Sequence, residues 1–139
     1  MYISATLRQF VTERAKNCCE YCLYPQAASF LSFEMEHIIA DKHHGQSVPE
    51  NLALACPYCN RYKGSDLGSI DPETMVLTPF FNPRTEIWAD HFKFDNGLIV
   101  GLTAEGRVTV DILQFNLQER VAERQRLYDA GILSVPHTA

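Results

Sequence analysis

Apolar side chains recur at helical spacing near the start of the chain. Over residues 4–17 they occupy Leu7, Phe10 and Val11, with the next at Ala15. This period of three to four positions is typical of one face of a helix. A short hydroxyl side chain such as that of Ser4 or Thr6 suits the first position, because it accepts a backbone N–H there. The pattern predicts a helix that ends just before the first cysteine pair.

Two short strands separated by a polar loop are predicted next. Residues 33–38 favour a strand that carries His37 near its end, and residues 52–55 favour a second strand. The stretch between them, residues 40–50, contains Gly, Ser and Pro and is predicted to be a loop. Residues 27–33 are too short and mixed to assign.

A short helix is predicted over residues 57–63. It begins with a proline, which suits a first turn, and Gly64 directly follows it, where a glycine stops a helix. The next stretch, residues 65–83, is interrupted by Gly and Pro and is predicted to be an extended wrapping segment. The central unit is therefore strand, loop, strand and helix.

The last third of the chain combines a hairpin with two helices. The Asp95-Asn96-Gly97 sequence is a strong hairpin signal between apolar runs. Gly131 is placed to end the last helix. The predicted elements are strands over residues 91–94 and 98–102 and helices over residues 103–114 and 117–130.

Length predicts one domain spanning residues 1–139. The mixture of predicted strands and helices makes it α+β, with the central unit at residues 18–65 as its core. No apolar run approaches the roughly 20 residues of a membrane helix, so no membrane partner is expected. The N-terminus has neither the basic nor the continuous apolar region of a signal peptide. We therefore expect a cytoplasmic protein, whose thiols stay reduced.

The net charge of −5 argues against tight, sequence-independent binding to long DNA, because such affinity comes from neutralised phosphates. Local clustering still sets the field that a ligand meets. Arg61 and Lys63 lie in the predicted helix over residues 57–63, and Lys42 and His44 lie in the predicted loop over residues 40–50. Arg61, Lys63 and His44 are therefore candidates for contact with a phosphate group; an ordinary solvated face is the alternative.

Four of the five cysteines form two Cys-x-x-Cys pairs, which favour a metal over disulfides in a reducing compartment. Two such pairs supply the four thiolates of a structural zinc site. The alternatives are buried inert thiols or a redox pair. Cys18 breaks the matched spacing and is expected to be a spare thiol. The predicted zinc ligands are Cys19, Cys22, Cys56 and Cys59.

An acid, a histidine and an amide lie close to these cysteines. Glu36 and Asn60 offer the oxygen ligands that Mg²⁺ or Mn²⁺ prefers. His37, neutral near pH 7, is suited to take a proton from water. Adjacent strand residues point to opposite faces, so Glu36 and His37 converge only if the strand ends or bends there. This combination indicates metal-assisted cleavage of a phosphodiester.

These residues resemble the motif of HNH endonucleases in their zinc-bearing form. Glu36-His37-Ile38, then Asn51-Leu52, then Cys56-x-x-Cys59-Asn60-x-x-Lys63-Gly64 carry the resemblance. It implies a ββα-metal fold around one catalytic divalent cation. By position, His37 is the implied general base, Glu36 and Asn60 the cation ligands, and Asn51 the residue that holds the loop through backbone hydrogen bonds. The four paired cysteines match the structural zinc of this subgroup.

Downstream residues extend the resemblance to small, stand-alone bacterial HNH proteins. They are Phe81-Asn82-Pro83-Arg84, Trp88, His91-Phe92, Gly101-Leu102-Thr103 and Gly106-Arg107. Arg84, Trp88 and His91 are expected to pack rather than to react. Glu36 stands where many members have Asp, and Ala40 replaces a frequent proline, which affects the expected metal preference and loop geometry.

The sequence therefore predicts a metal-dependent endonuclease acting on nucleic acid, DNA in the first instance. The resemblance implies products that carry 5′-phosphate and 3′-hydroxyl ends. Cutting both strands of a duplex calls for two sites, so a homodimer is one expected arrangement. The alternative is a non-catalytic zinc module that binds nucleic acid or protein. A thiol redox protein is a third reading. The target sequence, strandedness and biological system are not specified by these residues.

Overall fold

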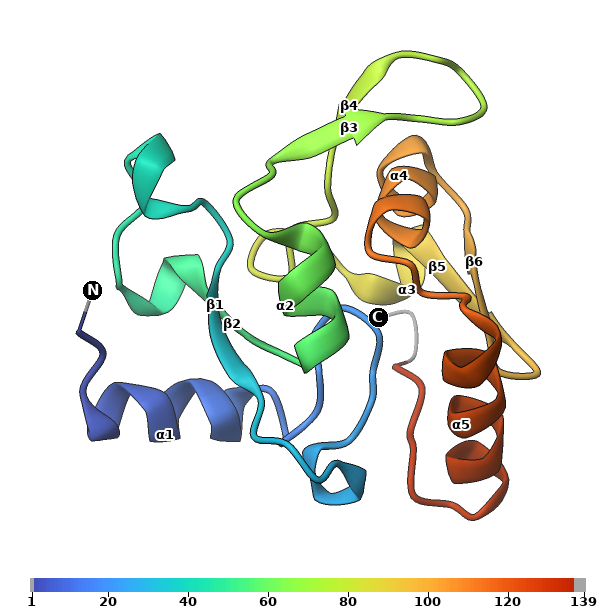
Figure 1. Cartoon of the computed structure of the whole chain (residues 1–139), viewed down its shortest axis with the longest axis horizontal. Coiled ribbons are helices and arrows are strands. Elements are labelled where there is room, and N and C mark those ends of the chain that lie inside the picture. The colour runs from blue at the N-terminus through green and yellow to red at the C-terminus, as the bar shows by residue number, and fades with distance from the viewer. Residues whose placement is uncertain (1, 137–139) are drawn as a thin grey trace. The chain divides into compact units, whose positions relative to one another are not determined.

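The computed structural model describes residues 2–136 (Figure 1). The chain divides into two compact units, one ending at Leu67 and the other beginning at Gly68. Both combine helices with pairs of antiparallel strands, so the predicted α+β class is confirmed. The organisation of the whole chain as one nuclease domain stays a prediction. None of the helices within residues 2–136 is long and apolar enough to cross a membrane.

The first helix, α1 (Ala5–Arg14), begins where the sequence indicates. The Ser4 hydroxyl accepts the backbone N–H of Leu7 at 3.1 Å, so Ser4 is the cap. Val11 is the buried residue of the apolar face. The helix ends earlier than predicted, because Lys16 and Asn17 adopt positive φ angles that an α-helix excludes.

The first unit is built on the predicted strand–loop–strand–helix sequence. Strand β1 (Glu34–His37) pairs antiparallel with β2 (Leu52–Ala55), so that His37 lies opposite Leu52. Every residue of β2 is buried, which explains its uninterrupted apolar run. Helix α2 (Pro57–Lys63) follows with the predicted bounds and ends at Gly64, whose φ is +52°.

The loop between the strands is partly ordered by two short 3₁₀ turns, Asp41–His43 and Pro49–Asn51. The unassigned segment before β1 contains a third, Gln26–Ala28. Gly45 is buried within the loop. A Cβ there would lie 1.6 Å from the carbonyl oxygen of Ile39, so the close approach of these backbones requires glycine.

The second unit opens with a hairpin that the sequence did not reveal. Strands β3 (Gly68–Ile70) and β4 (Leu77–Pro79) pair antiparallel within the segment predicted to be extended wrapping chain. Each strand has three residues, too few for an alternating pattern, and the register sets Gly68 opposite Pro79, two residues typical of turns. That part of the prediction was wrong.

The predicted second hairpin is present, but its first strand begins one residue later. Helix α3 (Trp88–His91) precedes it, so His91 ends a helix and does not start a strand. Strand β5 (Phe92–Asp95) then pairs with β6 (Leu98–Gly101) around the Asn96-Gly97 turn. The short helix escaped prediction because four residues show no helical period.

Two helices complete the second unit: α4 (Ala104–Ile112), capped by the Thr103 hydroxyl, and α5 (Gln118–Asp129). In the core of this unit, the ring centroid of Phe92 lies 5.0 Å from that of Trp88 in α3 and 5.8 Å from that of Phe115, between α4 and α5. These contacts agree with the packing role expected of Trp88. The core of this unit also includes Ile99, Val108, Leu113 and Leu127.

Candidate metal centre and active site

The two Cys-x-x-Cys pairs converge in the first unit. The sulfur atoms of Cys19, Cys22, Cys56 and Cys59 all lie within 4.8 Å of one another, and all four side chains are buried. Cys22 Sγ and Cys56 Sγ are 3.6 Å apart. Thiolates at tetrahedral corners about 2.3 Å from zinc would be separated by about 3.8 Å. The cluster therefore has the donor set and spacing of a Cys₄ zinc site.

Backbone N–H groups support the sulfur atoms of both pairs. The N–H of Cys22 points to Cys19 Sγ at 3.5 Å, and that of Cys59 points to Cys56 Sγ at 3.4 Å. Burial raises the pKa of the Cys19 and Cys59 thiols, so a metal must displace their protons on binding. Cys18 lies outside the cluster, with its thiol donating to the Lys16 carbonyl at 3.4 Å.

Asn51 ties the two ends of the β1–β2 loop together. Its amide nitrogen donates to the carbonyls of Ile39 and Gln46, and its amide oxygen accepts the N–H of Ile39, each at 2.9 Å. These are backbone hydrogen bonds of the kind expected for this position. They fix the chain just beyond His37, where β1 ends.

His37 is half-buried at the end of β1. Its Nε2 lies 2.8 Å from the hydroxyl of Ser47, a residue of the loop that Asn51 holds. Burial lowers the pKa of His37, the nearby Lys63 ammonium lowers it further, and the Asp41 carboxylate opposes them. Since the ordinary histidine pKa is about 6.5, the ring is predominantly neutral at pH 7 and able to accept a proton.

The Glu36 carboxylate faces the interior and has two partners. Its Oε1 lies 2.7 Å from the Lys63 ammonium, and its Oε2 accepts the Tyr21 hydroxyl at 3.1 Å. Burial raises the pKa of Glu36, while Lys63 and Tyr21 oppose the rise. Both oxygens that were expected to face a catalytic cation are therefore already engaged within the protein.

Asn60 lies on α2, three positions before Lys63 and thus on the same side of the helix. It is half-buried, and among residues 2–136 no side-chain hydrogen bond holds its amide. The oxygen of Asn60 thus suits a cation ligand. Glu36 fits that role less well, because its charge is balanced by an ammonium group at contact distance.

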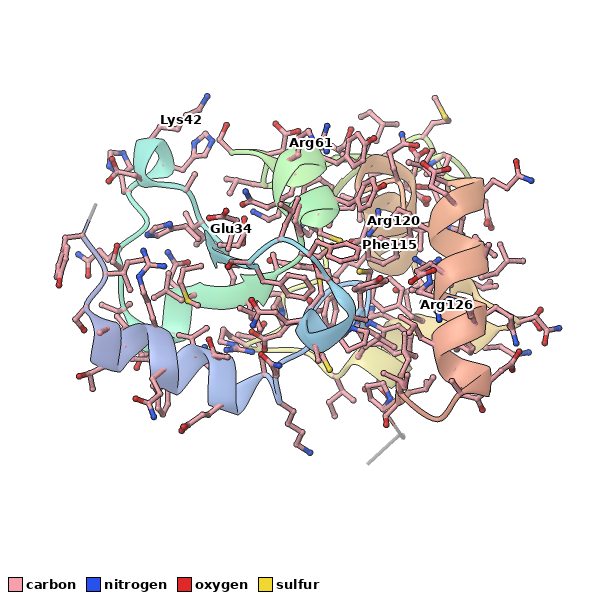
Figure 2. The ribbon with its side chains drawn as sticks, turned by 60° about the horizontal axis from the view of Figure 1, so that its bottom comes forward. Glu34, Lys42, Arg61, Phe115, Arg120 and Arg126 are labelled. Carbon is pink, nitrogen blue, oxygen red and sulfur yellow. The ribbon has the colours of Figure 1, made fainter. Side chains whose placement is uncertain are left out.

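The basic residues expected to contact substrate divide into two kinds. Arg61, labelled in Figure 2, and His44 are exposed. Lys63 is only 2% exposed, and its ammonium donates to the carbonyls of His37 and Ile38 at 3.3 and 3.0 Å. In this position Lys63 binds the end of β1, and its buried ammonium group is not available to contact phosphate.

Comparison with known proteins identifies this segment. A model of the HNH endonuclease family matches residues 19–66. Residues 19–66 are an HNH domain. The match spans both cysteine pairs, β1, β2 and α2.

A curated relative extends beyond the HNH domain. Septu protein PtuB of Bacillus thuringiensis is 27% identical over 111 residues, which cover 78% of this chain and 40% of that protein. The chain thus spans about two fifths of the relative's length. No solved structure matches the chain with comparable significance.

Three contacts of the HNH domain were not anticipated from the sequence. Tyr21 binds Glu36, Ser47 binds His37, and the Arg14 guanidinium donates to the carbonyls of Pro49 and Leu52 at 2.9 and 2.7 Å. Tyr21 lies between the two cysteines of the first pair, and this position was the only feature of the sequence that pointed to it. The other two join residues remote in sequence, so no local pattern reveals them.

Proposed function

We propose that the HNH domain hydrolyses phosphodiester bonds of nucleic acid, DNA in the first instance, with His37 as general base. The proposal rests on the placement of His37. Its imidazole is half-buried and predominantly neutral, and it lies at the end of β1 in a domain of a nuclease family. A general base contributes about 10²–10⁴-fold to such a reaction.

The Ser47 contact favours one tautomer for this task. If Nε2–H donates to the Ser47 hydroxyl, Nδ1 carries the free lone pair, and residues 2–136 give Nδ1 no hydrogen bond. Nδ1 then takes a proton from water as the water oxygen attacks phosphorus. The bond from phosphorus to the 3′ oxygen breaks, leaving a 5′-phosphate and, after protonation, a 3′-hydroxyl.

Asn60, together with Glu36, is proposed to hold a divalent cation such as Mg²⁺ or Mn²⁺. When bound, such a cation withdraws charge from the phosphoryl oxygens and stabilises the leaving oxygen. Since Glu36 is paired with Lys63, it would have to share its carboxylate with that ammonium. Arg61 and His44 are proposed to contact substrate phosphate. Lys63 is not assigned this role, because its side chain is buried.

The Glu36–Lys63 pair is also the observation that favours a second candidate function. A neutralised carboxylate suits a non-catalytic zinc module that binds nucleic acid or protein.

A homodimer remains the arrangement proposed for cutting both strands of a duplex, since one such site serves one strand at a time.

The deciding experiment is nicking of supercoiled plasmid by the zinc-loaded protein in Mg²⁺ or Mn²⁺. The wild type is expected to nick, and His37→Ala to lose about 10²-fold or more. His43→Ala, an exposed histidine in the same loop, is the matched control and should keep full activity. Absence of nicking by the wild type, or equal nicking by His37→Ala, would favour the non-catalytic module.

The pH dependence of nicking tests the same base independently. Activity should fall as the pH drops through the pKa of His37, because only the neutral ring accepts a proton. Since burial lowers that pKa, the midpoint is expected below the ordinary value of about 6.5. A rate independent of pH between about 5 and 7 would argue against a histidine base.

A further inference from the structure

A second group of metal-ligating side chains lies in the unit beginning at Gly68. Glu86, His91 and Glu105 place one donor atom each within 4.8 Å of one another. Glu86 precedes α3, His91 is the last residue of α3, and Glu105 is in the first turn of α4. All three side chains are half-buried. The zinc ligands, His37 and Asn60 all belong to the other unit.

The histidine is held in the orientation that a metal ligand needs. His91 Nδ1 lies 2.7 Å from the Thr103 hydroxyl, and that hydroxyl oxygen also accepts the N–H of Gly106 at 3.0 Å. The other nitrogen, Nε2, faces Glu86 Oε2 at 3.1 Å. A metal-binding imidazole characteristically donates through one nitrogen to a fixed oxygen while the other faces the ion.

The carboxylate of Glu86 is oriented in the same way. Its second oxygen, Oε1, accepts the backbone N–H of Asn82 at 2.9 Å, which leaves Oε2 directed to the cluster. Ligating carboxylates are themselves hydrogen-bonded in this manner. The donor atoms of Glu86 and His91 are therefore oriented by the Asn82 backbone and the Thr103 hydroxyl before any ion binds.

The two carboxylates of the cluster are also not balanced by a basic side chain other than His91 in the described residues. Within residues 2–136 no Lys or Arg forms an ion pair with Glu86 or Glu105. A positive ion bound there would have no Lys or Arg competing for the two carboxylates.

We propose that Glu86, His91 and Glu105 bind a divalent first-row transition metal ion such as Mn²⁺. Two carboxylates and one imidazole are a mixed oxygen and nitrogen set, which suits Mn²⁺ or Zn²⁺ better than the all-oxygen sites of Ca²⁺. Water completes the coordination. The ion joins the end of α3 to the start of α4, and its ligands belong to the second unit, whereas the zinc ligands and Asn60 belong to the first.

The test is Mn²⁺ binding by the zinc-loaded full chain carrying Asn60→Ala, which weakens the proposed nuclease cation site. Equilibrium dialysis should find one Mn²⁺ per chain at this cluster. Adding Glu105→Gln should weaken that binding about tenfold or more. Mn²⁺ should also broaden the ring NMR signals of His91, identified by their loss in His91→Gln.

The matched control is Glu119→Gln, which removes one exposed carboxylate from α5 of the same unit and should leave Mn²⁺ binding unchanged. Zinc content and far-UV circular dichroism establish that each variant is folded. Equal Mn²⁺ affinity with and without Glu105→Gln, or His91 signals unaffected by Mn²⁺, would overturn the proposal. Glu105→Asp keeps the carboxylate and should retain measurable binding.

Discussion

At the scale of single residues, the buried Glu36–Lys63 pair gives both side chains a role different from the expected one. Lys63 binds the Glu36 carboxylate and the carbonyls of His37 and Ile38, and so fixes the strand end that carries His37. Removing one partner of a buried pair leaves an uncompensated charge and typically costs about 3–5 kcal/mol. Replacing both partners with neutral groups of similar size costs much less.

Lys63→Met is therefore expected to lower the free energy of unfolding by about 3–5 kcal/mol. The double variant Glu36→Gln/Lys63→Met should recover most of that loss, since no buried charge remains. Urea denaturation of the zinc-loaded proteins measures both values. Lys42→Met, at an exposed lysine, is the control and should change stability little. A Lys63→Met protein as stable as this control would contradict the buried pair.

At the scale of elements, the β3–β4 hairpin depends on a charged residue at its turn. The Asp71 carboxylate accepts the Arg107 guanidinium of α4 through both oxygens, at 3.0 and 2.9 Å, and also accepts the hydroxyl of Thr74 at 2.8 Å. The Arg107 guanidinium and these hydrogen bonds hold the pKa of Asp71 well below its usual range. The hairpin and α4 are thereby joined by a bidentate ion pair.

Asp71→Asn should lower the Tm by several degrees at pH 7. Because the pKa of Asp71 is depressed in the folded state, its contribution is present above the unfolded pKa of about 3.9 and is lost at lower pH. The difference in Tm between wild type and variant should therefore shrink as the pH falls below about 4. Thermal denaturation from pH 7 to pH 2 measures this trend.

Asp111→Asn removes a carboxylate from the exposed face of α4 and serves as its control. It should show a small Tm difference that changes little with pH. A constant Tm difference for Asp71→Asn across the same range would mean that the carboxylate charge does not hold the hairpin.

At the scale of the whole molecule, zinc is expected to determine whether the HNH domain folds. The cysteine pairs fasten the segment after α1 to the start of α2, and β1 and β2 lie between them in sequence. Structural zinc contributes roughly 10–16 kcal/mol of apparent binding free energy in small peptides. This equals or exceeds the roughly 5–15 kcal/mol that stabilises a typical domain.

Zinc removal by a chelator should therefore unfold the first unit. Amide hydrogen exchange should lose protection in β1, β2 and α2, while the hairpins and helices from residue 68 onward, which contain no cysteine, keep theirs. Cys59→Ser should abolish zinc binding, and Cys18→Ser, at the thiol outside the cluster, should leave one zinc per chain. A protein that keeps full protection without zinc would show the four thiols to be ordinary core.

The sequence by itself determined those features that a few neighbouring residues encode. Paired cysteines separated by two residues indicated the metal cluster, the Asn96-Gly97 turn indicated the β5–β6 hairpin, and Pro57 and Gly64 marked the bounds of α2. The apolar run of β2 was equally visible. Each of these signals is local, because turn chemistry and helix termination depend on the backbone of adjacent residues.

Only the tertiary structure decided what the charged and polar side chains contact. The pairing of Glu36 with Lys63 and of His37 with Ser47, and the meeting of Glu86, His91 and Glu105, each join residues separated along the chain. Burial sets the pKa of such groups, and burial follows from packing rather than from residue type. The sequence therefore indicated His37 as the candidate base. The fold determined that Lys63 supports the strand of His37 and is too buried to contact a nucleic-acid phosphate.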